Sequence, residues 1–268
     1  MSRLTDYQDN YPNLRFERQD GVLQLTLHRD GGEFVVSEPA LRDLGKAFVQ
    51  VAEDPGNRVV ILTGTGERFA TQFDYGSFHE TMQPDVFEYW IRTRTDGVRL
   101  LRAFLDIEVP VISAINGPIV SHSEMPLLAD VVLATVDTVF QDATHFIQGL
   151  PPGDGMHTVW TTLLGLNRGR HFLMTGRVIT AHEAFDLGVV GEVVDREELL
   201  PRAWELARQW AGLSSATLRG TRAILTMEWR RLLSEQLHTG LTHEALAGVF
   251  AGAFPMPEIP IRDLDPRT

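Results

Sequence analysis

The sequence predicts an α/β protein in which a parallel sheet is followed by a helical C-terminal region. Continuous apolar runs, at residues 59–63 (VVILT) and 110–115 (PVISAI), are typical of strands buried on both faces of a parallel sheet. Segments with apolar residues three and four positions apart alternate with these runs, which favours parallel strands joined by helices. From residue 157 onward helical segments dominate.

The first elements along the chain are an expected hairpin and an amphipathic helix. Residues 22–28 alternate between apolar and polar side chains after the turn dipeptide Asp20-Gly21, so we expect them to pair with residues 14–17. Residues 38–52 carry apolar side chains at helical spacing, with Pro39 where the first turn accepts proline. We therefore expect a helix over this segment.

The remaining elements continue the alternation of strands and helices. We expect a helix over residues 97–105, a strand over 131–135, a short extended piece over 138–140 and a short strand over 191–194. The proline-rich residues 255–260 cannot continue a helix, and we expect them to be extended.

Charge and composition narrow the classes of partner. The 24 Lys and Arg residues against 36 Asp and Glu residues give a net charge of −12, which disfavours nucleic acids and anionic membranes. Cysteine is absent, which excludes disulfides, thiolate nucleophiles and cysteine-based metal sites. No apolar run approaches the roughly 20 residues that a membrane span needs, and residues 1–21 are polar. We expect a cytoplasmic protein.

A series of short motifs runs along most of the chain. It includes VVILTGTGERF at residues 59–69, the strand that ends in Asn116-Gly117, and Pro-Gly-Asp-Gly at residues 152–155. In order and spacing the series resembles the crotonase (enoyl-CoA hydratase/isomerase) superfamily. The resemblance implies a ββα spiral core over residues 1–200 and a helical trimerisation region over 201–268, with no linker between them. It also implies a homotrimer or a dimer of trimers.

The chain departs from the common crotonase pattern where the oxyanion hole is expected. Crotonases place small residues, commonly glycines, after Asn-Gly-x-x-x, whereas this chain has His122 within Ser-His-Ser-Glu. Residues 70–74 (ATQFD) replace the family's Ala-Gly-x-Asp loop, and Lys46 is the only lysine. These differences argue against a standard site for a coenzyme A thioester.

The histidine after Asn-Gly-Pro makes the chain similar to a branch of the superfamily formed by 6-oxocamphor hydrolase and related β-diketone hydrolases. That resemblance implies a hydrolase that cleaves a carbon–carbon bond of a cyclic or bicyclic β-diketone without coenzyme A, giving a keto acid. It also implies catalytic roles for four residues, which are His122, His145, Asp154 and Glu244. The branch has a tryptophan and a histidine at the site where this chain reads FVVSEPAL at residues 34–41.

The implied retro-Claisen hydrolysis needs a base, an oxyanion donor and a proton source, but no cofactor. We assign the base to His145, oriented by Asp154, because a carboxylate raises the pKa of an imidazole and fixes its tautomer. We expect His122 to hold the alkoxide or enolate oxygen, with Glu244 as its partner. No metal is expected, since no His-Glu-x-x-His or facial-triad spacing occurs.

Two other functions remain open from the sequence. One is a coenzyme A-dependent enoyl-CoA hydratase or isomerase of the same fold, and the other is a catalytically silent binding scaffold. The aromatic residues Phe87, Tyr89 and Trp90 could wall an apolar substrate pocket, belong to an ordinary core or form a subunit contact.

Overall fold

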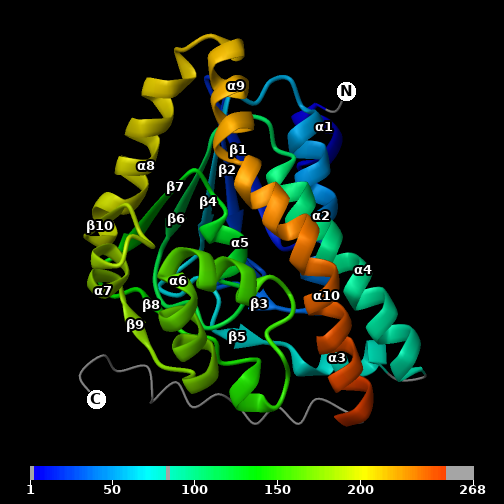
Figure 1. Ribbon diagram of the computed structural model, residues 1–268. Helices are drawn as coiled ribbons and strands as arrows, with labels where there is room; N and C mark the ends of the chain where they lie inside the picture. The colour runs from blue at the N-terminus through cyan, green and yellow to red at the C-terminus, as the bar shows by residue number, and fades with distance from the viewer. Residues whose placement is uncertain (1–2, 83–84, 252–268) are drawn as a thin grey trace.

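The computed structural model describes residues 3–82 and 85–251, and residues 255–260 lie outside that range. A six-stranded sheet forms its centre, with helices on both sides (Figure 1). The strand order is β1-β2-β4-β6-β7-β10, where β1 runs antiparallel to β2 and the others are parallel. These strands are β1 (Leu14–Gln19), β2 (Val22–Leu27), β4 (Val59–Gly64), β6 (Val111–Ile115), β7 (Val131–Thr135) and β10 (Glu192–Val194). The predicted α/β class and hairpin are confirmed.

Two small pairs of strands flank the sheet. The strand β3 (Val35–Val36) pairs with β5 (Gln72–Phe73) in parallel, and β8 (Val139–Phe140) pairs with β9 (Ile179–Thr180) in antiparallel fashion. Each pair fixes a loop, because β5 leads into the helix α3 and β8 leads into the segment that carries His145.

The helices cover the sheet and continue into the C-terminal region. The helix α2 begins where the Oγ of Ser37 accepts the N–H of Ala40, with Pro39 in its first turn as expected. The helix α4 is longer than the 97–105 segment that the sequence predicts. The helices are α1 (Leu4–Tyr7), α2 (Glu38–Glu53), α3 (Tyr75–Met82), α4 (Val86–Leu105), α5 (Glu124–Leu127), the 3₁₀ helix η1 (Phe146–Gln148), α6 (Met156–Thr175), α7 (Ala181–Asp186), α8 (Arg196–Ala211), α9 (Ser215–Leu225) and α10 (Met227–Ala251).

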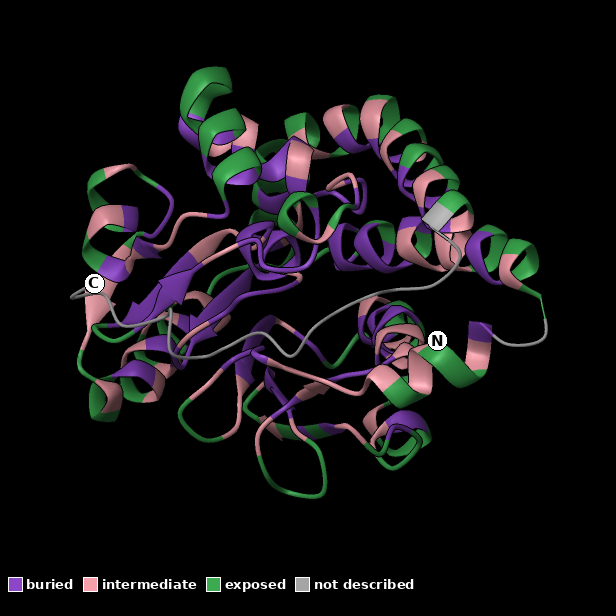
Figure 2. Cartoon of the chain, turned by 90° about the horizontal axis from the view of Figure 1, so that it is seen from below, coloured by how far each residue is buried: buried purple, intermediate pink, exposed green. Residues whose placement is uncertain are grey.

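The sheet is buried on both faces, as its continuous apolar strands predict. The neighbouring β4 residues Ile61 and Leu62 point to opposite faces, and each is at most 1% exposed. Leu62 belongs to the large core that includes residues of α2 and α4, whereas Ile61 packs in the cluster that contains α8 residues such as Ala203. Figure 2 shows central strands coloured as buried, with the exposed residues mainly on the surrounding helices and loops.

The C-terminal helices pack onto this core. The helix α8 lies against β4 and β6, and α10 runs beside α4 (Figure 1). The expected division at residue 200 falls within α8, which spans Arg196–Ala211. None of the helices in residues 3–82 and 85–251 has the length and apolarity that a membrane crossing requires.

Candidate active site

A cavity of about 450 Å³ brings the four predicted site residues together. Its lining includes His122, His145, Asp154 and Glu244, which come from four separate segments of the chain. The rest of the wall is largely apolar and comes mainly from α3 and α4, with further residues from α2, β5 and α10. An apolar cavity with a few converging polar groups is typical of a site for a small molecule.

The loop after β6 positions His122. The amide of Asn116 donates to the carbonyl of Gly66 at 2.8 Å and accepts the N–H of Gly64 at 3.1 Å, which ties this loop to the end of β4. Gly117 has φ +148, and a Cβ there would lie 1.8 Å from the carbonyl oxygen of Glu67, so this position requires glycine. His122 itself has φ 50, a left-handed conformation that is costly for a side chain with a Cβ.

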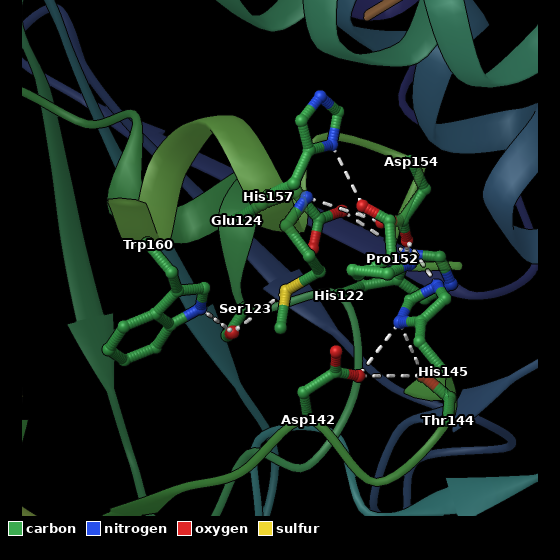
Figure 3. Close-up of polar contacts among 11 residues, drawn as sticks. His122, Ser123, Glu124, Asp142, Thr144, His145, Pro152, Asp154, His157 and Trp160 are labelled. Atoms are coloured by element: carbon green, nitrogen blue, oxygen red, sulfur yellow. Dashed lines mark hydrogen bonds and ion pairs between the residues drawn. The ribbon is translucent and has the colours of Figure 1, made fainter. Parts of the chain in front are cut away.

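Two carboxylates contact the imidazole of His122 (Figure 3). Its Nδ1 lies 3.2 Å from Oε1 of Glu124 and 3.3 Å from Oδ2 of Asp154. Glu244, the expected partner of His122, lies instead with His145 and Asp154, where one atom of each side chain falls within 4.8 Å of the others. The sequence prediction missed Glu124 as a partner, although its place two residues after His122 was a usable signal.

His145 lies between two aspartates. Its Nδ1 is 2.7 Å from Oδ1 of Asp142, and its Nε2 is 3.5 Å from Oδ2 of Asp154 (Figure 3). Asp154, the predicted orienting residue, is thus the more distant of the two partners. The spacing Asp142-x-x-His145 is the signal that could have identified Asp142.

A close backbone crossing brings Glu244 to the other residues. A Cβ on Gly153 would lie 2.2 Å from the carbonyl oxygen of Gly240, and one on Gly240 would lie 2.4 Å from the carbonyl oxygen of Gly153. The Pro-Gly-Asp-Gly segment can therefore press against α10 only with glycine at both positions. One turn beyond this crossing on α10, Glu244 reaches the cavity beside Asp154.

Burial and mutual repulsion separate the carboxyl groups into neutral and ionised forms. Burial and the charge of Asp154 raise the pKa of Glu244 to about 8 and the pKa of Glu124 to about 7. For Asp154 itself, burial opposes ionisation, but the imidazoles of His145 and His122 outweigh it and lower the pKa. Asp154 is thus the ionised carboxylate between two imidazoles, and Glu244 is a neutral acid at pH 7.

Both site histidines hold their proton more tightly than a free imidazole. Burial lowers the pKa of His145, but Asp142 and then Asp154 outweigh it, so the pKa lies well above 6.5. Burial also lowers the pKa of His122, and Glu124 and Asp154 reverse this to give a raised value. The nearby His157 has a lowered pKa, mainly through burial, and its Nδ1 contacts the carbonyl of Pro152 at 2.8 Å.

Two groups in the described part of the chain have the residue types and spacing to hold a metal ion. They are His122 with Glu124 and Asp154, and His145 with Asp154 and Glu244. In both groups the histidine already forms ion pairs of 3.2–3.5 Å, His122 with Glu124 and Asp154, and His145 with Asp154. We assign no ion to them, and the absence of a metal stays a prediction.

The aromatic segment around residue 90 contributes to the wall of the cavity. Tyr89 and Trp90 line it, as the pocket alternative expects, whereas the side chain of Phe87 is 60% exposed and does not. Leu41 is the part of the 34–41 stretch that reaches the cavity together with Glu38. An indole therefore lines the site, but it comes from α4.

Comparison with known proteins gives two kinds of relative. A family model described as enoyl-CoA hydratase/isomerase matches residues 17–245. The carnitinyl-CoA dehydratase of Salmonella arizonae is 32% identical over 199 residues, which is 74% of each chain. The probable peroxisomal enoyl-CoA hydratase 1 of Arabidopsis thaliana is 30% identical over 188 residues, covering 70% of this chain and 68% of its own.

The solved structures include a relative whose named activity differs from the enoyl-CoA hydratase and carnitinyl-CoA dehydratase activities above. The β-diketone hydrolase of the cyanobacterium Anabaena sp. PCC 7120, bound to (S)-3-oxocyclohexyl acetic acid, is 40% identical with a TM-score of 0.89. The match covers 92% of this chain and 98% of that one. An enoyl-CoA hydratase/isomerase from Mycobacterium paratuberculosis, at 23% identity and a TM-score of 0.82, shares the fold.

Proposed function

The chain belongs to the enoyl-CoA hydratase/isomerase (crotonase) family, and we propose that it hydrolyses a carbon–carbon bond of a cyclic or bicyclic β-diketone without coenzyme A. One observation carries the proposal. His122 stands where crotonases commonly have glycine, and it shares a mostly apolar cavity with His145, Asp154 and Glu244. The likeness to the Anabaena β-diketone hydrolase supports the same assignment.

In the proposed reaction, water adds to one carbonyl while the neutral form of His145 takes a proton from it. The resulting tetrahedral alkoxide is stabilised by a hydrogen bond from an N–H of the His122 imidazole. The alkoxide collapses, the bond to the carbon between the carbonyls breaks, and its electron pair becomes the enolate of the other ketone. Protonation of that carbon gives a keto acid. In the overall reaction one diketone and one water therefore give one keto acid.

The carboxyl groups take complementary roles in this proposal. Asp154 stays ionised and holds the two imidazoles in register, since it contacts both of them. Glu244 is protonated below a pH of about 8 and lines the cavity, so it donates a hydrogen bond to the second carbonyl. This role replaces the one expected from the sequence, in which Glu244 served His122.

The test is turnover of diketones by the purified protein in buffer without coenzyme A. A suitable substrate is the bicyclic dione obtained when the carboxyl carbon of 3-oxocyclohexyl acetic acid is bonded, with loss of water, to ring carbon 4, the carbon next to the ring ketone. Gas chromatography follows loss of the dione and appearance of the acid. Failure to hydrolyse any of a panel of cyclic and bicyclic diketones, together with turnover of an enoyl-CoA, refutes the proposal.

The names of the curated relatives favour a second candidate, a coenzyme A-dependent enoyl-CoA hydratase or isomerase. Calorimetry with coenzyme A and an acyl-CoA separates the two. The proposal predicts no binding at micromolar concentrations, because His122 occupies the usual place of the peptide donors and Lys46 is the only lysine.

We also propose that the protein is a homotrimer or a dimer of trimers, assembled through the region from residue 201 onward. Exposed apolar side chains at the junction of α9 and α10 support this, since such a group is expected to be covered by another surface. They are Ile224, Leu225 and Met227. Light scattering that gives the mass of a monomer at micromolar concentration contradicts this assembly.

A further inference from the structure

Asp142 is a fully buried carboxylate beside the proposed base. It is 0% exposed, and its Oδ1 lies 2.7 Å from Nδ1 of His145, against 3.5 Å between Asp154 and the Nε2 of the same ring. The hydroxyl of Thr144 lies 3.3 Å from that Nδ1 and donates to Oδ1 of Asp142 at 3.5 Å. Figure 3 shows Asp142 and Asp154 on opposite sides of the imidazole.

The backbone holds Asp142 in place. The residues on either side of it donate to the loop that leads to His122, from Gln141 to the carbonyl of Ile119 at 3.2 Å and from Ala143 to the carbonyl of Val120 at 3.0 Å. His145 and Thr144 line the cavity, but Asp142 is not among the lining residues. Its carboxylate can therefore act on a substrate only through the ring of His145.

A neutral imidazole has one N–H and one lone pair, so the partner of one nitrogen decides the role of the other. A carboxylate at 2.7 Å from Nδ1 keeps the proton there and leaves the lone pair on Nε2. The Nε2 faces Asp154, which lines the cavity. This tautomer therefore presents the basic nitrogen to the cavity, where it can take a proton from water.

We propose that Asp142 is the positioning residue of this site, which fixes the tautomer and orientation of His145 so that Nε2 acts as the base. The assignment rests on the proposed diketone hydrolysis and changes which aspartate orients His145. Asp142 orients the base, and the ionised Asp154 pairs with Nε2 once that nitrogen has taken the proton.

The first test compares Asp142→Asn with a matched control. We expect D142N to lower kcat by about 10²–10⁴, as loss of the orienting carboxylate does at other histidine bases, with KM changed less than about threefold. The control is Asp54→Asn, because Asp54 is equally buried but bonds Tyr7 and Arg18 away from the cavity. D54N should leave kcat unchanged even if it lowers the melting temperature.

The pH profile gives a readout that a merely structural role would not move. In D142N the rising limb of kcat/KM should shift to lower pH by about 1–3 units, because the ring loses one neighbouring negative charge. The charged and titratable groups that act on His145 in the structure lie on several segments around it; they are Asp142, Asp154, Glu244, His122 and His157. Unchanged kcat and an unmoved limb in D142N would overturn the proposal.

A second measurement does not depend on activity or on the variant being folded. In ¹⁵N-histidine-labelled wild-type protein, NMR should show neutral His145 with its proton on Nδ1. A neutral Nε2–H tautomer overturns the assignment of Asp142, whatever the substrate is. If the Nδ1–H tautomer is found but no diketone is hydrolysed, the proposed function fails while Asp142 still orients the ring.

Discussion

Replacement of His122 by glycine probes the chemistry and the fold separately. Glycine is the residue that the family commonly carries near this position, and it accepts the φ of 50 that His122 adopts. Asparagine is a matched second variant, since it also tolerates the left-handed region and retains an amide donor. The comparison of H122G with H122N therefore isolates the hydrogen bond to the oxyanion.

The structure sets the expected magnitudes. Removing the left-handed strain of His122 stabilises the fold by about 1–2 kcal/mol, and losing the contacts with Glu124 and Asp154 costs about 1.5–3 kcal/mol. The two effects nearly cancel, so H122G should remain folded. Loss of one oxyanion donor lowers kcat by about 10²–10³, equivalent to about 2.7–4 kcal/mol of barrier. The effect on the reaction thus exceeds the net effect on stability.

The assay is steady-state hydrolysis of the bicyclic dione, with melting curves of each variant as a check on folding. H122N should lose less activity than H122G, because asparagine keeps an amide N–H that can donate to the oxyanion and glycine has no side-chain donor. A kcat of H122G within a factor of about three of the wild type would refute the assignment of His122 to the oxyanion.

Three further outcomes follow from the geometry. Glu244→Gln keeps a donor and should stay within about tenfold of the wild-type kcat, whereas Glu244→Ala should lose about 10²–10³; equal losses would contradict a donor role. Because His145 must be neutral to act as a base and its pKa is raised well above 6.5, kcat/KM should rise with pH above that value, and a flat profile there would count against it. Gly153→Ala places a Cβ 2.2 Å from the carbonyl of Gly240 and should destabilise the fold by about 1–3 kcal/mol in calorimetry. Gly220→Ala, which has open space in α9, should not, and equal melting temperatures for the two variants would be inconsistent with the tight crossing.

The strands of the sheet were predictable because the run of apolar residues within a strand is enough to indicate that the strand is buried. The run at 59–63 is apolar throughout since successive residues, such as Ile61 and Leu62, pack on opposite faces. The helix α4 was predicted only from residue 97. Its first half carries Tyr89 and Trp90 toward the cavity, and such a segment lacks the regular apolar stripe of a core helix.

That the four residues expected from the sequence share a cavity was predictable, but their pairings were not, and their catalytic roles stay predictions. The four residues expected from the sequence line one cavity, yet the contacts among them depend on how the loops cross. Glu244 lies beside Asp154 because Gly153 and Gly240 let two backbones touch, which no local pattern records. Likewise Asp142, rather than Asp154, is nearest to His145 because the loop after β8 turns within three residues.

The most direct measurement of the central claim is a crystal structure with 3-oxocyclohexyl acetic acid bound, because its carboxylate marks where negative oxygen accumulates. We expect one carboxylate oxygen at about 2.7–3.2 Å from a nitrogen of His122 and the other facing Nε2 of His145. A ligand whose carboxylate lies away from both imidazoles would contradict the account.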